Sequence, residues 1–353
     1  MAYHFALSPL YINFVPMKYS FIVPVYNRPD EVDELLQSLT TQRLTDFEVL
    51  VVEDGSSVPC KDVVDKYTHL LNVTYYAKPN SGPGQSRNYG VERAKGEYVI
   101  ILDSDVVLPE GYLQAVDAEL SSHPCDAFGG PDCAHPSFTS TQKAISYAMT
   151  SFFTTGGIRG GKKKMDKFYP RSFNMGIRRE VYDALHGFSE MRFGEDIDFS
   201  TRIFENHYTA HLFPEAWVWH KRRTDFRKFF KQVYNSGIAR INLTKRHPGT
   251  LKLVHTLPAV FTVGCFALLL LSILALVLGC PHWWVMLLPF ALFSLIILLD
   301  ATIRSRSLSV GLRAIVASFV QLWGYGSGFC VAWWKRCVRH EGEFEAFRKN
   351  FYK

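Results

Sequence analysis

The stretch Tyr98-Val99-Ile100-Ile101-Leu102-Asp103-Ser104-Asp105 decides the fold, because an apolar run of strand length ends directly in two carboxylates. Ligands bind outside the carboxyl ends of the strands in open α/β sheets. Side chains two residues apart lie on the same face of an extended backbone, so Asp103 and Asp105 stay close together. Such a pair suits Mg²⁺ or Mn²⁺ carrying a substrate diphosphate. It also fits an acidic turn that only closes a buried strand.

The composition separates a soluble part of the chain from an apolar part. The chain has 353 residues, enough for two domains, and its apolar residues concentrate after Leu257. Its net charge of +6 gathers in clusters beside the apolar runs, which favours a membrane surface or an anionic substrate over nucleic acid. Seven cysteines without a CxxC pair argue against a zinc site or a disulfide framework, and favour a reducing cytosolic setting.

The region before residue 110 predicts alternating strands and helices. We expect strands at 19–25, 47–52, 73–77 and 98–102, and helices at 29–41, 59–69 and 80–95. Carboxylates follow two of these strands, which indicates a mostly parallel sheet flanked by helices that binds a nucleotide. No GxGxxG follows the first strand and no Walker lysine motif is present, so a dinucleotide or P-loop site is disfavoured.

Two basic features have both a functional and a structural interpretation. Gly82 and Gly84 allow a tight turn that brings Arg87 toward the sheet edge, where the alternative is a solvated helix charge. The lysine-rich loop 156–164 is either a lid over phosphates or a solvated loop.

The same holds for two groups further along the chain. Capping of a predicted helix at 195–206 suits Glu195 and Asp196, but does not explain a third carboxylate at Asp198. His220 follows two tryptophans and is either a ligand or a core histidine.

In order and rough spacing, these motifs resemble family 2 glycosyltransferases over about residues 18–246. The motifs that carry the resemblance are Val23-Pro24-Val25-Tyr26-Asn27, Glu53-Asp54-Gly55-Ser56, Arg87-Asn88, Asp103-Ser104-Asp105, Gly194-Glu195-Asp196 and His220. The resemblance implies a GT-A fold, the α/β nucleotide-diphospho-sugar transferase fold with a mostly parallel sheet. It also implies transfer of a sugar from a nucleotide diphosphate donor with inversion.

The resemblance implies a role for individual residues. Asp196 would be the general base on the acceptor hydroxyl, with Glu195 beside it. Asp105 would hold Mg²⁺ or Mn²⁺, and His220 would be a further metal or diphosphate contact. The residues implied to bind the nucleotide-sugar, a UDP- or GDP-sugar, are Pro24, Tyr26, Asn27, Asp54, Arg87, Asp103 and Ser104.

Chemistry supports this reading, and two departures limit it. A divalent ion offsets the charge of a leaving diphosphate, and a carboxylate must then reach the acceptor hydroxyl. The usual Asp-Asp pair after the second strand is Glu53-Asp54 here, a mild change if the second residue makes the contact. The QxxRW signature of processive synthases is absent from residues 232–240, which favours single, non-processive transfer.

Three apolar runs predict a membrane region at 254–334, with helices at about 257–279, 283–303 and 312–334. A very short link makes the first two a hairpin. Basic residues on both sides of the hairpin place the enzyme domain in the cytoplasm, on a multi-pass protein of the inner cell membrane. The basic residues after the third run conflict with this rule if that run spans. The run therefore either spans or re-enters at its glycines.

The predicted domain order is an N-terminal tail at 1–17, a GT-A domain at 18–223, an amphipathic interface helix at 224–253, the membrane region, and a basic tail at 335–353. In the interface helix, Phe226, Phe229, Phe230 and Val233 recur at near-helical spacing among basic residues. This pattern predicts a helix that lies on the membrane surface.

The leading hypothesis is a membrane-bound, inverting glycosyltransferase in cell-surface polysaccharide synthesis, whose acceptor is a glycan or lipid-linked saccharide. The expected partners are the donor, that acceptor and membrane lipid, with no nucleic acid. A close alternative is a polyprenyl-phosphate glycosyltransferase, whose acceptor is the lipid phosphate itself. A non-catalytic sugar-nucleotide-binding assembly protein is disfavoured, because a binding module has no need of a base such as Asp196.

Overall fold

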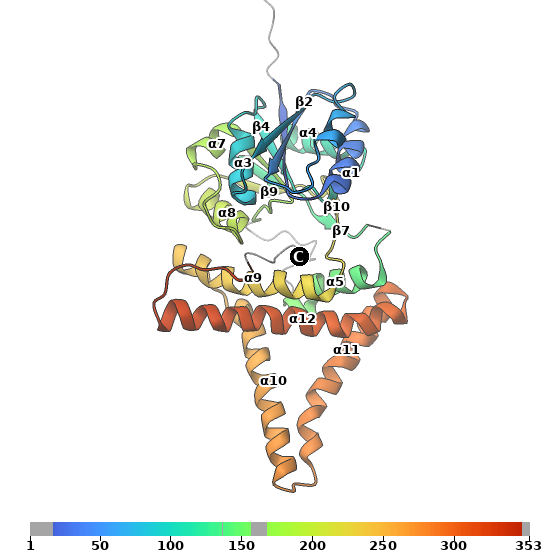
Figure 1. Cartoon of the computed structure of the whole chain (residues 1–353), viewed down its shortest axis with the longest axis vertical. Helices are drawn as coiled ribbons and strands as arrows, with labels where there is room; N and C mark the ends of the chain where they lie inside the picture. The colour runs from blue at the N-terminus through green and yellow to red at the C-terminus, as the bar shows by residue number, and fades with distance from the viewer. Residues whose placement is uncertain (1–16, 136, 157–167, 348–353) are drawn as a thin grey trace, which may run out of the picture.

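A computed structural model describes residues 17–135, 137–156 and 168–347, so most of the predicted N-terminal tail and lysine-rich loop lies outside the described residues. It shows an α/β domain above a helical region (Figure 1). The central sheet has the strand order β3-β2-β1-β4-β8-β6-β9. Its strands are β1 (Tyr19–Val25), β2 (Phe47–Asp54), β3 (Val73–Lys78), β4 (Tyr98–Leu102), β6 (Ala127–Gly129), β8 (Asn174–Arg178) and β9 (Ala210–Leu212).

The sheet is mostly parallel, as predicted. Strands β3, β2, β1 and β4 are parallel neighbours, and only β8 runs antiparallel to its two neighbours, β4 and β6. The four predicted strands are confirmed, with β2 and β3 slightly longer than expected. The apolar residues of β1, β2 and β4 are buried on both faces, which explains why these strands are continuous hydrophobic runs.

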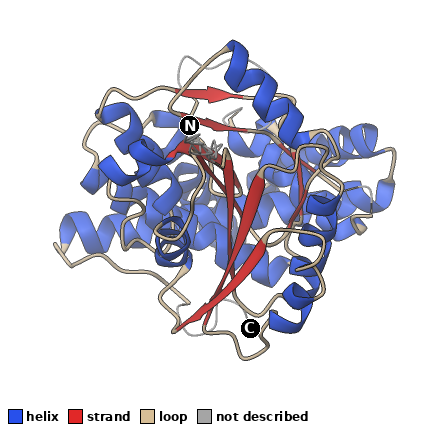
Figure 2. Cartoon of the chain, turned by 90° about the horizontal axis from the view of Figure 1, so that it is seen from above, coloured by secondary structure: helices blue, strands red, loops and turns tan. Residues whose placement is uncertain are grey.

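Helices cover both faces of the sheet (Figure 2). One face packs against α1 (Pro29–Thr40), α2 (Lys61–Asp65) and α4 (Tyr112–Ser122). The other packs against α3 (Pro83–Val91), α7 (Arg179–Ala184) and α8 (Glu195–Glu205). The predicted helices at 59–69 and 80–95 are too long. Residues 80–82 instead form a loop in which the Asn80 side chain and the backbone amides of Ser81 and Gly82 donate to the Asp54 carboxylate.

A second sheet of three short strands lies at the carboxyl end of β4. It contains β5 (Val106–Val107), β10 (Val218–His220) and β7 (Asp132–Cys133), in that order. Strand β10 is antiparallel to β5 and pairs His220 with Val106. This pairing brings the histidine next to the acidic end of β4 from more than a hundred residues away.

The helical region contains α5 (Ser140–Thr150), α6 (Phe152–Thr155), α9 (Phe226–Arg246), α10 (Leu253–Val277), α11 (Leu288–Ser305) and α12 (Leu308–Trp333). Among the described residues, three helical segments are long and apolar enough to cross a membrane: Leu253–Val277, Trp283–Ser305 and Leu308–Val338. The predicted hairpin is present as α10 and α11, joined by a 3-10 turn at Trp283–Leu287. Helices α9 and α12 pack side by side and run crosswise to this hairpin (Figure 1).

One open alternative for this region is excluded, and one expectation is corrected. The glycines of the third apolar run do not break it, because α12 is one continuous helix. Gly324 and Gly328 instead let α12 approach Val233 and Tyr234 of α9 more closely than a Cβ would allow. Val233, expected on the membrane surface, is therefore buried against α12 together with Phe229.

The segment after α12 also differs from a free basic tail. It turns back along α9, where Asn235 donates a side-chain hydrogen bond to the Ala346 carbonyl and Asn242 donates one to Phe344. The carboxylate of Glu341 lies 3.1 Å from the Arg339 guanidinium. Because α9 lies between the α/β domain and the hairpin (Figure 1), the two hydrogen bonds to α9 place this segment on the same side of the hairpin as the α/β domain.

Candidate active site at the end of strand β4

The two aspartates after β4 and His220 form a compact cluster. One potential ligand atom from each of Asp103, Asp105 and His220 lies within 4.8 Å of the others. His220 Nε2 is 3.3 Å from Asp105 Oδ1, and the ring stacks on Phe173 with centroids 4.9 Å apart. The predicted proximity of the three residues is confirmed.

Cationic side chains surround this cluster. Arg28 Nη1 lies 2.6 Å from Asp105 Oδ2. Asp132 forms an ion pair with Arg222 at 2.6 Å, and its Oδ2 lies 3.6 Å from His220 Nδ1. Burial opposes ionisation of Asp105, but Arg28 and His220 hold the pKa of its carboxyl well below its usual range. Burial also disfavours the charged ring of His220, yet Asp105 and Asp132 raise its pKa to about 9.

The residues fit a divalent ion. Asp105 Oδ1 and His220 Nδ1 are buried and accept or donate no hydrogen bond among the described residues. Two carboxylates and an imidazole offer oxygen and nitrogen ligands of the kind that Mn²⁺ or Mg²⁺ accepts. An ion that bound the His220 ring would have to displace its proton, so binding is expected to release protons.

Arg87 connects this cluster to the start of α8. Its guanidinium is 2.8 Å from Asp103 Oδ1 and 2.8 Å from Glu195 Oε1, and the side chain is buried. The solvated alternative for Arg87 is therefore wrong. Burial raises the pKa of Glu195 to about 7, against the opposing effect of Arg87 and with help from the charge of Asp196.

Asp196 lies in the first turn of α8. Arg171 donates to its Oδ2 at 2.6 Å, and the amide of Ile197 donates to its Oδ1. Burial opposes ionisation, but Arg171 lowers the pKa of this carboxyl, so the carboxylate stays charged near neutrality. Gly194 precedes the helix with φ of 83°, and a Cβ at this position would lie 3.3 Å from Ala239 and 3.2 Å from Leu243 of α9. The start of α8 therefore rests directly on α9.

The end of β2 is built differently. The Asp54 carboxylate accepts hydrogen bonds from the amides of Ser81 and Gly82 at 2.8 and 2.9 Å and from the side chains of Lys78 and Asn80. Its oxygens are thus engaged by the loop that opens α3. Glu53 similarly accepts from the amide of Cys60 and from the Ser56 hydroxyl.

The remaining predicted donor-binding residues lie at the end of β1 and after β4. Pro24 belongs to β1, and Asn27 follows it with φ of 56° and binds the 56–58 loop through its amide and its side-chain oxygen. Tyr26 is half-buried, and Ser104 is buried between the two aspartates.

Sequence reasoning missed four charged residues of the site: Arg28, Asp132, Arg171 and Arg222. Arg28 directly follows the motif at the end of β1 and was within reach of the sequence argument. The other three lie outside the motifs, and the fold alone brings them to the cluster.

Comparisons with known proteins agree with this geometry. A sequence model described as "Glycosyl transferase family 2" matches residues 20–185. The poly(ribitol-phosphate) beta-N-acetylglucosaminyltransferase TarS of Staphylococcus aureus is 39% identical over 114 residues, covering 31% of this chain and 20% of that protein. The poly(ribitol-phosphate) beta-glucosyltransferase of Bacillus spizizenii is 37% identical over 94 residues, covering 25% of this chain and 15% of the relative. The chain thus matches a fifth or less of the length of these relatives.

Among solved structures, the mannosyltransferase PcManGT from Pyrobaculum calidifontis, in complex with GDP-Man and Mn²⁺, has a TM-score of 0.60 at 19% identity. The alignment covers 88% of each chain, so it shows a shared fold. The chain therefore carries a glycosyltransferase family 2 domain on a GT-A fold.

Proposed function

We propose that the protein is an inverting, metal-dependent glycosyltransferase that moves one sugar from a UDP- or GDP-sugar to a hydroxyl of a glycan or lipid-linked acceptor. The observation that carries the proposal is the connection of the Asp103, Asp105 and His220 cluster to the start of α8 through Arg87. One end of this arrangement suits a metal–diphosphate, and the other offers a carboxylate to an acceptor.

The donor would lie across the carboxyl ends of β1 and β4. Pro24 and Tyr26 would line the base pocket with Asn27 and Ser104, and Asp54 would shape its wall through the 78–82 loop. Asp105 and His220 would hold Mg²⁺ or Mn²⁺ with Asp103 nearby, and the ion would offset the charge of the leaving diphosphate. The complex of PcManGT with GDP-Man and Mn²⁺ supports a donor and an ion of these classes.

The reaction needs one base. Asp196 would take the proton of the acceptor hydroxyl while that oxygen forms its bond to the anomeric carbon. The bond from this carbon to the diphosphate oxygen breaks, and the nucleoside diphosphate leaves with that electron pair. Arg171 would keep Asp196 ionised before the transfer, and Arg87 would hold Glu195 beside it. A single displacement inverts the anomeric configuration.

The membrane would hold the enzyme through α10 and α11. Basic residues precede the hairpin at Lys245, Arg246 and Lys252 and follow it at Arg304 and Arg306. Because basic residues favour the cytoplasmic side, the α/β domain would lie on the cytoplasmic side of the inner membrane. Nucleotide-sugars are made there. The relatives named as poly(ribitol-phosphate) transferases support a polymer as acceptor.

The polyprenyl-phosphate alternative has one observation in its favour. Because Gly194 contacts Ala239 and Leu243, the start of α8 lies against the helical region that carries the hairpin. A lipid phosphate could approach from there. A phosphate acceptor is already anionic and needs no base, so dependence on Asp196 separates the two acceptors.

The test is a panel of UDP- and GDP-sugars with Mn²⁺, Mg²⁺ or EDTA, scored by release of nucleoside diphosphate from the detergent-solubilised full chain. We expect one donor to be hydrolysed or transferred only with metal, and Asp105→Asn to abolish this activity. Asp46→Asn, a change at an exposed carboxylate away from the site, is the matched control. Metal-independent turnover, or equal turnover by Asp105→Asn, would contradict the proposal.

A further inference from the structure

Helix α12 touches both arms of the hairpin at the same end. Gly326 of α12 lies against Pro258 and Thr262 in the first turns of α10, and Thr262 Oγ1 donates to the Leu322 carbonyl at 3.2 Å. Gly311, near the start of α12, lies against Thr302 in the last turns of α11.

These contacts fix the direction of α12. The start of α10 and the end of α11 lie at one level, because the two helices form an antiparallel hairpin (Figure 1). Gly311 and Gly326 are about 22 Å apart along a helix that rises 1.5 Å per residue. A helix that meets both arms at one level over such a length crosses the open end of the hairpin. It cannot run parallel to α10.

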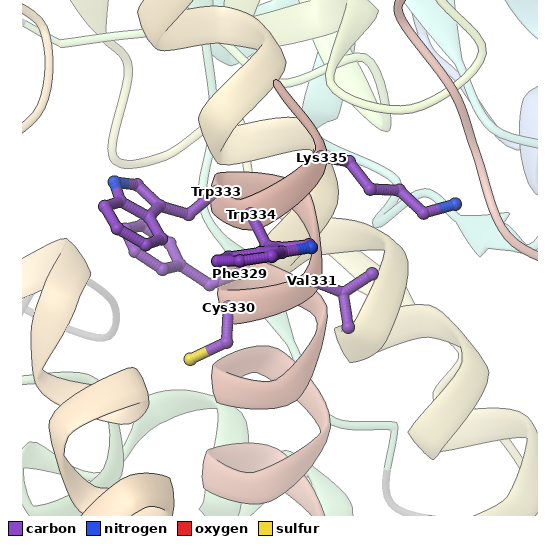
Figure 3. Close-up of a pocket in the computed structure, with 6 residues that line it drawn as sticks. All are labelled: Phe329, Cys330, Val331, Trp333, Trp334 and Lys335. Atoms are coloured by element: carbon purple, nitrogen blue, oxygen red, sulfur yellow. The ribbon is translucent and has the colours of Figure 1, made fainter. Parts of the chain in front are cut away.

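The face of α12 that no described element covers carries large apolar side chains at both ends, with the exposed Arg313 among those near its start. Leu308, Leu312 and Val316 are exposed near its start, and Trp333 and Trp334 are about half exposed near its end. Around the two tryptophans lies an open groove of about 580 Å³, lined by Phe329, Cys330, Val331, Trp333, Trp334 and Lys335 (Figure 3).

Charge changes abruptly where this groove ends. Lys335 borders it, and Arg339 follows one turn later with its side chain largely exposed. Both cations lie near the single carboxylate of Glu341, at 3.9 and 3.1 Å, so the pair keeps one excess positive charge. Tryptophan side chains favour the headgroup level of a bilayer, and basic residues beside them attract anionic lipids. The end of α12 therefore has an apolar surface and a cationic rim in the order that an anionic lipid presents its chains and phosphate.

We propose that α12 lies in the plane of the membrane at the headgroup level, with its exposed face on lipid and with Lys335 and Arg339 on anionic phospholipid headgroups. The proposal rests on membrane anchoring by the hairpin, and not on sugar transfer. It removes the conflict in the charge pattern. The basic residues after α12 stay on the cytoplasmic side, on the tail that Asn235 and Asn242 bind to α9.

The direction of α12 is measured by the immersion depth of spin labels in proteoliposomes of phosphatidylcholine and phosphatidylglycerol. Single cysteines at the exposed positions Leu312, Val316 and Val331 are labelled in a full-length variant whose seven native cysteines are alanine and whose circular dichroism matches the wild type. We expect three shallow depths that differ by no more than about 10 Å, the diameter of one helix. A spanning α12 would separate the labels at 312 and 331 by about 28 Å.

Labels at the exposed positions Val263, Leu270 and Val277 of α10 separate this proposal from the anchoring on which it rests. A spanning hairpin gives depths that change by about 10 Å between successive labels. Constant depth there means that the anchoring itself is wrong, whereas a depth gradient in α12 overturns only the in-plane helix. If the cysteine-free chain does not fold, an epitope tag after residue 353 gives a second measurement. It must be accessible from the side of the enzyme domain, and accessibility from the opposite side overturns the proposal.

The headgroup contact has its own readout. A bimane label at 331 should be quenched about two-fold more by doxyl-phosphatidylglycerol than by doxyl-phosphatidylcholine. The double variant Lys335→Gln/Arg339→Gln should lose this preference. The control Arg93→Gln, which removes a basic side chain from the enzyme domain, should keep it. Equal quenching by both lipids in the unsubstituted protein would refute the anionic-lipid contact.

Discussion

Strands β2 and β4 both end in two carboxylates, but the contacts of the two pairs differ. Glu53 and Asp54 accept hydrogen bonds from backbone amides of the loops that follow β2 and β3. Asp103 and Asp105 face the guanidinium groups of two arginines and the ring of His220. Backbone amides hold the first pair, and charged side chains hold the second.

We propose that this difference separates structural from functional carboxylates. An amide donor in a tight loop cannot leave its acceptor without unfolding the loop, and an unpaired buried carboxylate is costly. An arginine side chain can rotate away when a metal or diphosphate arrives. Replacing an acid at the β2 end should therefore cost stability, and replacing one on the β4 side should cost activity.

The largest expected effect is on Asp196, which Arg87 and Glu195 connect to the β4 end. Asp196→Asn keeps the shape and the Ile197 contact but cannot accept a proton. We expect transfer to fall by about 10²–10⁴-fold, with donor affinity within a few-fold of wild type. The measurement is transfer rate and donor affinity on the same variant.

The matched control for that change is Asp198→Asn. Asp198 lies in the same turn, but it pairs with His247 at 3.0 Å and with Arg202, away from the cluster. This variant should lose stability and keep transfer within about 10-fold of wild type. Near-normal transfer by Asp196→Asn would place the base elsewhere, and would favour the lipid-phosphate acceptor.

The next effect is on Asp105. Loss of an outer-shell partner alone costs about 10–100-fold in metal affinity at characterised sites, so loss of a ligand should cost at least about 100-fold. Asp105→Asn should therefore lose metal-dependent donor binding in calorimetry while its circular dichroism stays that of the folded wild type. Retained metal-stimulated binding would mean that the β4 end is only an acidic turn.

A smaller effect is expected for Asp54→Asn, and it is on stability. The new amide faces the donors of Ser81 and Gly82, so the loop loses at least one acceptor. We expect the free energy of unfolding to fall by about 1–3 kcal/mol, seen as a lower melting temperature of the full chain in detergent. An unchanged melting temperature together with lost nucleotide binding would contradict the comparison. It would mean that Asp54 contacts the nucleotide-sugar directly.

The comparison also marks what sequence could predict. Strands β1, β2 and β4 are short apolar runs buried on both faces, and the motif after β4 places Asp103 and Asp105 together. His220 reaches them through the pairing of β10 with β5. The acidic pairs after β2 and β4 look alike in the sequence, but their partners differ. The sequence does not show this, because Arg28 and the 78–82 loop reach these acids only in the folded chain.

The helical region shows a second limit. Hydropathy predicted the lengths of α10, α11 and α12, because a run of about twenty apolar residues can be recognised in the sequence whichever way the helix points in the structure. The crosswise direction of α12 depends on Gly311 and Gly326, whose contacts with the two arms of the hairpin have no signature in a hydropathy pattern. The burial of Val233 depends on the same packing.

The last expected effect is a pH dependence on the β4 side. Burial raises the pKa of Glu195 from an ordinary value of 4.5 to about 7. The folded state therefore holds a proton that the unfolded state releases between these values, so this group's contribution to stability is full below pH 4.5 and lost as pH rises through 7. The slope is at most about 1.4 kcal/mol per pH unit for one proton.

Glu195→Gln should remove this pH dependence of stability and leave the contributions of His220 and Asp196. The raised pKa of His220, about 9, acts at higher pH, and the lowered pKa of Asp196 acts at lower pH, because that group's stabilisation is lost as pH falls. Melting temperatures of both proteins from pH 4.5 to 8 give the difference curve. It should be flat for a control change at Asp46, and should rise in favour of the variant between pH 4.5 and 7. A flat curve for Glu195→Gln would mean that Arg87 keeps Glu195 ionised throughout, and that the β4 side holds only charged carboxylates.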